Sequence, residues 1–142
     1  MNRDQQRDIL LKELRLRFKY GLKCRWGETS EETGILTDIV KVECEDGFSY
    51  YDCYFDNDDN NDVLIDLVCP MLRPLSSITI EEGKEFYEKF GIKFSMLNSI
   101  LSEIKGYGTS DMRYLTELID WLNTKQFDYN NLIELGIACK LS

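Results

Sequence analysis

The strongest hairpin signal in this chain of 142 residues lies between Ile35 and Phe55, where the sequence reads ILTDIVKVECEDGFSYYDCYF. Residues 35–44 are rich in β-branched side chains, which favour strands. Glu45-Asp46-Gly47 follows and marks a tight turn, because glycine accepts the positive φ that such turns need. Residues 48–55 are therefore predicted to return as an antiparallel partner strand.

Two shorter extended runs flank this hairpin. Residues 22–26 alternate apolar and basic side chains, and residues 63–69 form a short apolar run. Pro70 and Pro74 have no backbone N–H, so regular pairing should stop there. These signals predict a small, curled antiparallel sheet of three or four strands, SH3-like in shape.

Helical patterns lie on both sides of this β region. The first segment carries apolar residues at helical spacing and is predicted to be a helix up to about Arg17. Three or four further helices are predicted after residue 77. The expected class is α+β, and the expected organisation is a single domain over 1–142, with a helix plus β module at 1–76 and a helical part at 77–142.

The C-terminal helices have clear boundary signals. Thr79 and Glu82 have the spacing of a capping box, so a helix should begin near Ile80 and end at Gly91. Residues 95–105 and a stretch from about residue 112 also have helical periodicity. Asp128 is expected to cap a last short turn.

The composition excludes several chemistries. The chain has no histidine and a net charge of −9. Without histidine there is no Ser-His-Asp triad, no Cys-His pair and no imidazole metal ligand. A chain this short also leaves little room for a deep pocket with supporting side chains. We therefore expect a protein that is not an enzyme and needs no cofactor.

The chain contains five cysteines, an odd number without a C-x-x-C pair. Structural zinc sites usually take ligands from such close pairs, so a site built from Cys24, Cys44, Cys53 and Cys69 is not favoured. With Cys139, they are expected to be small, reduced, mostly buried side chains. No segment reaches the roughly 18 apolar residues of a membrane span, and residues 1–7 lack the apolar core of a secretory signal. The expected location is cytoplasmic, away from membranes.

Charge is distributed unevenly along the chain. Residues 1–27 have a net charge of +5, residues 28–66 of −12 and residues 67–142 of −2. Such a distribution indicates either internal pairing or two opposed surface patches.

The negative region contains the first candidate site. The predicted strand at 48–55 carries aromatic residues on both of its faces. An acidic loop follows it at 56–62. This is either a central strand covered on both sides or an exposed aromatic patch edged by acid, which is typical of protein-binding surfaces. The partner-binding candidates are Tyr50, Tyr51, Tyr54, Asp56, Asp58, Asp59 and Asp62. The expected partner is another protein with a basic surface, and acidic mimicry of a nucleic-acid backbone is one form of this hypothesis.

The acidic loop also suggests a metal site. Asp56, Asp58, Asn60 and Asp62 alternate as the first ligands of an EF-hand do. The glycine and glutamate that complete such a loop are replaced by Asn61 and Leu67. A small enzyme that uses carboxylates or a divalent metal ion is therefore an alternative hypothesis.

The positive region suggests a second alternative, nucleic-acid binding. Basic residues at 12–25 are interleaved with Phe18, Tyr20 and Trp26, a combination that can pair phosphates and stack bases. The candidate residues are Arg15, Arg17, Lys19, Lys23 and Arg25. The net negative charge of the chain weighs against it.

Four segments resemble motifs of small uncharacterised proteins from gut Bacteroidales and their phages. They are LRPLSSIT at 72–79, the tail at 119–138, and LLKEL at 10–14 together with YGLKC at 20–24. The resemblance implies a cytosolic protein of a bacterial genome, prophage or mobile element, and it supplies no function. Inhibition or modulation of a host protein is an expectation that belongs to the protein-binding hypothesis. Those proteins usually carry Arg-Gly after Phe-Asp-Tyr, whereas this chain has Asn130-Asn131.

Overall fold

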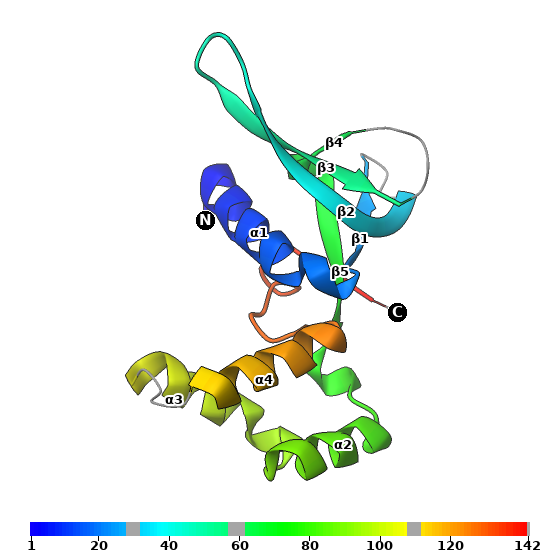
Figure 1. Cartoon of the computed structure of the whole chain (residues 1–142), viewed down its shortest axis with the longest axis vertical. Helices are drawn as coiled ribbons and strands as arrows, with labels where there is room; N and C mark the ends of the chain where they lie inside the picture. Colours follow the sequence, from blue (N-terminus) through cyan, green and yellow to red (C-terminus); the bar gives the residue numbers. More distant parts are fainter. Residues whose placement is uncertain (28–31, 57–61, 108–111, 142) are drawn as a thin grey trace.

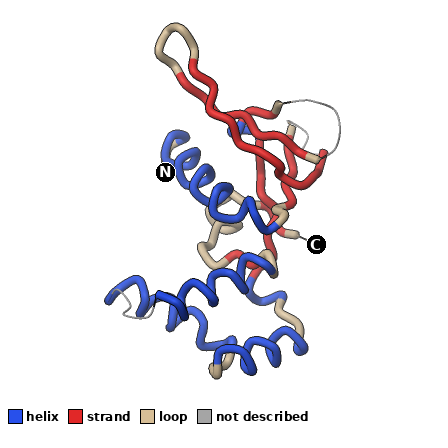
Figure 2. Tube along the Cα trace, viewed as in Figure 1, coloured by secondary structure: helices blue, strands red, loops and turns tan. Residues whose placement is uncertain are grey.

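The computed structural model describes residues 1–27, 32–56, 62–107 and 112–141, with only the backbone at 103–107 and 112–113. A sheet with one helix beside it occupies one end of the molecule, and three helices gather at the other (Figure 1). One strand, β5 (Val68–Pro74), runs from the sheet toward the helical end (Figure 2).

The N-terminal helix is confirmed up to Arg17. Helix α1 (Arg3–Arg17) begins at a capping box between Asn2 and Gln5. A single 3₁₀ turn follows and ends at Gly21, whose φ of +74° suits glycine. The buried face of α1 packs against the sheet through Leu10 and Leu14.

In the described part of the chain, the sheet has seven strands and is mixed. Its strands are β1 (Lys23–Trp26), β2 (Glu32–Glu43), β3 (Ser49–Phe55), β4 (Val63–Leu64), β5, β6 (Phe127–Asp128) and β7 (Cys139–Lys140). The order is β4-β3-β2-β1-β5-β6, and β7 also pairs with β5. Strands β1 to β4 form antiparallel pairs, whereas β6 and β7 lie parallel to β5.

The α+β class is confirmed, but the prediction of an SH3-like sheet of three or four strands is wrong. Strands of two residues, such as β6 and β7, are too short to show periodicity in a sequence. Strand β5 also continues through Pro70 and ends only at Pro74. Pro70 is the last residue paired with β1, and Pro74 is the last residue of the strand. Each proline thus stands where one ladder ends, so its missing N–H interrupts no continuous pairing.

The helical end follows the predicted boundaries closely. It contains α2 (Ile80–Phe90), α3 (Leu97–Tyr107) and α4 (Met112–Thr124). The capping box of Thr79 and Glu82 is confirmed, and Gly91 ends α2 with a φ of +71°. The Asp128 carboxylate accepts hydrogen bonds from three backbone N–H groups at 130–133, as expected of a cap.

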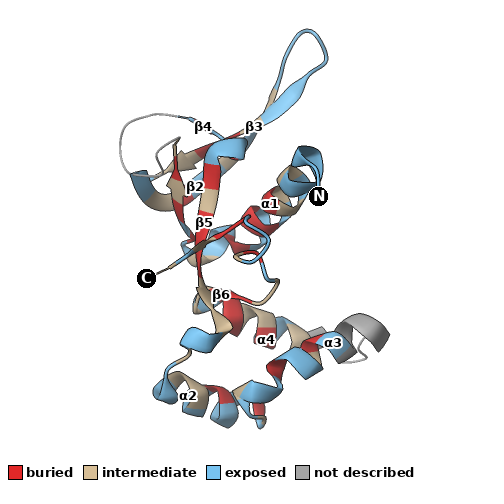
Figure 3. Cartoon of the chain, turned by 180° about the vertical axis from the view of Figure 1, so that it is seen from behind, coloured by how far each residue is buried: buried red, intermediate tan, exposed pale blue. Residues whose placement is uncertain are grey.

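Two groups of buried side chains stabilise the molecule. One lies between α1 and the sheet and includes Leu14, Cys24 and Leu72. The other lies among α2, α3 and α4 and contains a cluster of rings around Phe86 and Trp121. Figure 3 shows buried residues along β5 and on α4, between the exposed outer surfaces.

A buried guanidinium joins α1 to the segment that follows α4. The Arg17 side chain is 2% exposed and donates from Nε to Glu13 Oε2 at 3.0 Å. Its Nη1 donates to the Phe127 carbonyl at 2.9 Å, and its charge lies 4.7 Å from the Tyr129 ring centre. Asn130 Nδ2 donates to the other Glu13 oxygen at 2.7 Å. Residues more than 100 positions apart are thereby held together.

A second arginine links β5 to the start of α2. Arg73 donates to both carboxylate oxygens of Glu82, at 2.7 and 2.8 Å, and lies over the Phe127 ring. The hydrogen bond from Arg73 lowers the pKa of Glu82 to about 2. This ion pair fixes the angle at which the chain leaves the sheet for the helices.

The cysteines differ from the expectation of five reduced thiols. Cys69 on β5 and Cys139 on β7 form a disulfide, with Cα atoms 6.1 Å apart. Cys24 and Cys53 are free and buried, as expected, whereas Cys44 is free and exposed. The disulfide lies where β7 joins the sheet.

We expect Arg17→Met to lower the free energy of unfolding by about 3–5 kcal/mol, because the Glu13 carboxylate would stay buried without its charged partner. Urea unfolding would measure it. Lys12→Met changes an exposed cation of the same helix and should cost at most about 0.5 kcal/mol. Equal small effects of the two substitutions would contradict the role of Arg17.

We expect Cys139→Ser to lower the free energy of unfolding of the oxidised protein by about 2–4 kcal/mol, because the disulfide closes a loop of some 70 residues. A reducing agent should make wild type and variant equal. Cys44→Ser, at an exposed free thiol, is the control. If Cys139→Ser were as stable as the oxidised wild type, the disulfide would contribute nothing.

Candidate protein-binding surface

Strands β2 and β3 extend past the rest of the sheet as a two-stranded hairpin arm, residues 38–54. Strand β1 pairs with β2 only over 32–35, and β4 pairs with β3 only at Asp52 and Cys53. Within the described part of the chain, residues 38–43 therefore pair only with β3, and residues 49–51 pair only with β2. Figures 1 and 3 show the arm projecting beyond the sheet, with an exposed tip.

The predicted hairpin turn is confirmed at the tip. Cys44 N donates to the Phe48 carbonyl at 2.8 Å, which leaves a three-residue loop at 45–47. Gly47 has a φ of +88°, and Asp46 Oδ1 accepts from Phe48 N. This is the arrangement of a type I turn followed by a left-handed residue. The Phe48 side chain is 73% exposed.

The strand register gives the arm two different faces. Val40 lies opposite Asp52, and Val42 lies opposite Tyr50. Alternation then defines an outer face, made of Asp38, Val40, Val42, Tyr50, Asp52 and Tyr54. The inner face carries Ile39, Tyr51 and Cys53, which pack against the core between the sheet and α1.

Carboxylates surround the two tyrosines of the outer face. Asp52 is 5% exposed, and its side chain hydrogen-bonds that of Asp62. Burial, followed by this contact, raises the pKa of Asp52. Burial also raises the pKa of Tyr50 and of Tyr54, and the charges of Asp52 and Asp62 add to both effects. The patch is therefore acidic and aromatic.

The structure brings together only some of the predicted partner-binding residues. Tyr50, Tyr54 and Asp62 share the outer surface of the arm. Tyr51 lies on the inner face, with the Arg15 guanidinium 5.3 Å from its ring centre. The Asp56 carboxylate accepts from Ile35 N at 2.8 Å and so holds the end of β3. The candidates Asp58 and Asp59 lie outside the described residues.

Asp38 and Asp52 were missed from the sequence. Two signals could have identified them. Asp52 lies two positions from each tyrosine, so strand alternation places it on the same face. The register set by the turn at 45–47 then places Asp38 opposite Tyr54.

The structure also places the residues of the metal alternative. Asp56 binds a backbone N–H, Asp62 contacts Asp52, and Asp58 and Asn60 fall outside the described ranges. In the described part of the chain, no three His, Cys, Asp or Glu residues gather as a metal site would need.

The basic residues of the nucleic-acid alternative do not form one stripe. Arg17 is enclosed by Glu13, Phe127 and Tyr129, where no phosphate could reach it. Arg15 lies in the last turn of α1 and Lys19 in the 3₁₀ turn that follows it, whereas Lys23 and Arg25 are on β1, exposed and half-buried respectively.

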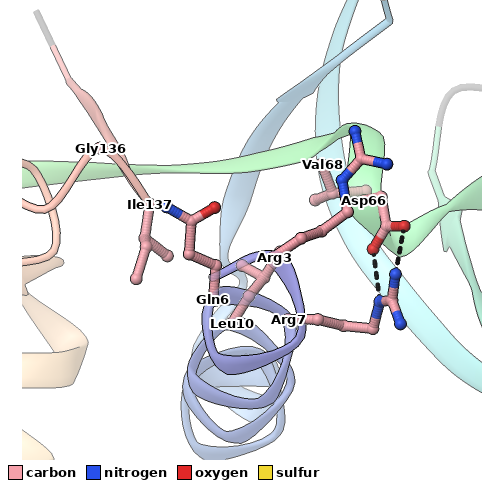
Figure 4. A pocket seen from close by; sticks show the side chains of 8 residues that line it. All are labelled: Arg3, Gln6, Arg7, Leu10, Asp66, Val68, Gly136 and Ile137. Carbon is pink, nitrogen blue, oxygen red and sulfur yellow. Dashed lines mark hydrogen bonds and ion pairs between the residues drawn. The ribbon is translucent and has the colours of Figure 1, made fainter. Parts of the chain in front are cut away.

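A small cavity of about 230 Å³ lies between the start of α1 and β5 (Figure 4). Arg7 donates to both oxygens of Asp66 there, at 2.7 and 2.8 Å, and this contact lowers the pKa of Asp66. Arg3 extends toward the same carboxylate. The ion pair links α1 to the segment just before β5. The Asp66 carboxylate already neutralises the charge of Arg7, so that cation is not available to a ligand.

Among the described helices, none has the length and apolar character needed to cross a membrane. Comparisons of the chain with protein-family models, with curated proteins and with solved structures found no match.

We expect Asp52→Asn to raise stability at pH 7. A carboxyl whose pKa is raised above its ordinary value of 3.8 by folding binds its proton more tightly in the folded state. Its ionisation therefore opposes folding at neutral pH, and that effect disappears as the pH falls toward 4. Thermal unfolding between pH 7 and pH 4 should show the advantage of the variant shrinking on acidification.

Glu134→Gln, at an exposed carboxylate outside the patch, is the control and should leave the pH profile unchanged. The prediction would be contradicted if Asp52→Asn were less stable than the wild type at pH 7 and its stability varied with pH as that of the wild type does. The fold would then need the ionised carboxylate.

Proposed function

We propose that this chain is a non-catalytic protein-binding protein that holds a partner with a basic surface against the outer face of its hairpin arm. The observation that carries the proposal is the placement of Tyr50 and Tyr54 beside Asp38, Asp52 and Asp62 on a projecting ribbon. Tyrosines beside complementary charges are typical of the residues that dominate binding energy.

The length of the arm supports this function. A two-stranded ribbon beyond the edge of a sheet adds little stability of its own. The arm nevertheless exposes Val40, Phe48 and Tyr50, all large hydrophobic residues. Exposed apolar side chains on the outer face and tip of the arm, away from the core contacts of its inner face, are most simply explained by a partner that covers them.

Backbone groups on the arm offer a second means of contact. Residues 38–43 and 49–51 have no further strand partner among the described residues, so the outer backbone edge of each segment is open to another strand. A partner strand can add to such an edge, with main-chain hydrogen bonds giving affinity and side chains giving specificity.

The carboxylates would act chiefly on the association rate and on which partner is selected. Charges around an interface steer a complementary surface and repel a like one. A protein that binds nucleic acid has such a basic surface, so the partner could be one whose binding site the acidic arm imitates. In this proposal the chain acts in the cytoplasm and is encoded by a phage or mobile element, as the resemblance implies.

The other two functions have weaker support. The nucleic-acid hypothesis is weakened because Arg17, one of its five candidate residues, is buried in the interior. An enzyme would have to rely on the Asp52 and Asp62 pair, for which the described residues offer no third metal ligand.

A pull-down from the organism that carries the sequence tests the proposal. We expect a specific protein to co-purify with the wild type, and its amount to fall at least tenfold with Tyr50→Ala/Tyr54→Ala, since hot-spot residues each contribute about 2 kcal/mol or more. Raising salt from about 0.1 M to about 1 M shortens the screening length from ~10 Å to ~3 Å and should also release it.

Tyr87→Ala is the matched control, because Tyr87 is exposed on α2, outside the arm. Asp38→Asn/Asp62→Asn tests the charges separately from the rings. Retention of the same partner by both double variants, or binding that salt does not weaken, would contradict the proposed surface.

A further inference from the structure

A groove separates the end of α1 from α4. Its volume is about 570 Å³, within the range of small-molecule sites. The α1 side contributes Arg15 and Leu16 and continues with the 3₁₀ turn through Tyr20. On α4, Leu115, Ile119 and Asn123 follow one another at four-residue steps, so one row of that helix faces the groove.

Most of the lining is apolar. Leu16 and Phe18 are 41% and 37% exposed, although both lie against the groove. Leu115 and Ile119 on the opposite wall are half-buried. An open apolar surface between two helices has room for a ligand with a hydrocarbon or aromatic body.

The rim carries two cations. Arg15 and Lys19 are one helical turn apart, and neither forms an ion pair within the described part of the chain. The groove has a carboxylate in Asp120, which already accepts a hydrogen bond from the Tyr20 hydroxyl. The surplus charge at the rim is therefore positive in a chain whose total charge is −9.

A buried amide at the end of the α4 row lacks a partner. Asn123 is 2% exposed, and its Oδ1 accepts from the Tyr129 hydroxyl at 2.9 Å. Its Nδ2 has no hydrogen-bond acceptor among the described residues. Leaving a buried donor unsatisfied is unfavourable, and such groups call for an explanation. An oxygen of a bound ligand would supply the missing acceptor.

We propose that this groove binds a small organic acid, with one carboxylate on an apolar body. The carboxylate would take the hydrogen bond of Asn123 Nδ2 and the charge of Arg15 and Lys19. The apolar body would lie on Leu16, Phe18 and Ile119. The ligand carboxylate matches the unpartnered Asn123 amide and the two rim cations, which lie over the Tyr51 and Tyr20 rings but form no ion pair in the described part of the chain. The ligand proposed for the groove is distinct from the partner proposed for the outer face of the arm, although Arg15 also contacts Tyr51 on the inner face.

Titration with octanoate tests the proposal, followed by calorimetry and by thermal unfolding. Octanoate should bind and raise the unfolding midpoint with concentration, because it binds the folded state. Acetate, which has the charge without the apolar body, and octanol, which has the body without the charge, should each bind at least tenfold more weakly.

Variants locate the site. Arg15→Gln/Lys19→Gln should weaken octanoate binding at least tenfold, whereas Lys12→Gln/Lys23→Gln removes two exposed cations outside the groove and should not. Asn123→Asp keeps the acceptor for Tyr129 but replaces the donor with a like charge, so it should abolish binding.

Three outcomes would overturn the proposal. They are no stabilisation by octanoate, equal binding of octanol, and unaltered binding by Arg15→Gln/Lys19→Gln. An acidic, leucine-containing peptide that binds where octanoate does not would assign the groove to a protein segment instead.

Discussion

The enclosed guanidinium of Arg17 is the contact on which the arrangement of the two ends depends. A charge with 2% exposure has lost its water, and the Glu13 carboxylate, the Phe127 carbonyl and the Tyr129 ring replace it. Such a site tolerates little displacement, because Glu13 and the Phe127 carbonyl must stay within hydrogen-bond distance and the Tyr129 ring must stay against the guanidinium. It therefore sets where α1 lies relative to the segment that leaves α4, and with it the position of β6 beside β5.

The same helix separates a rigid part of the sheet from a projecting part. Near its N-terminus, α1 is tied to Asp66 through Arg7, and its middle packs into the core through Leu14. Beyond this region β2 and β3 keep contact with α1 on the inner face alone, where Arg15 covers Tyr51. The outer face is left to carry charge and rings, so binding residues can occupy it without loss of core packing.

Local signals in the sequence predicted local structure well. The turn at 45–47, the capping box of Thr79 and Glu82, and the end of α1 near Arg17 depend on neighbouring residues and were confirmed. Features that depend on distant partners were not predictable. Arg17 was assigned to a basic stripe because its spacing in the helix gives no sign of Phe127, 110 positions away. Two-residue strands and a strand that continues through a proline likewise depend on pairing across the fold.

The parallel pairing of β5 has a consequence for biosynthesis. Arg73 pairs with Phe127, and Met71 pairs with Cys139. At roughly 5–20 residues per second, translation needs several seconds to produce these partners after β5 has been made. During that interval the apolar edge of β5 would be open to other chains. A ribosome-bound chaperone, or quick docking of α1 across the nascent sheet, would protect the polypeptide from aggregation until its last strands emerge.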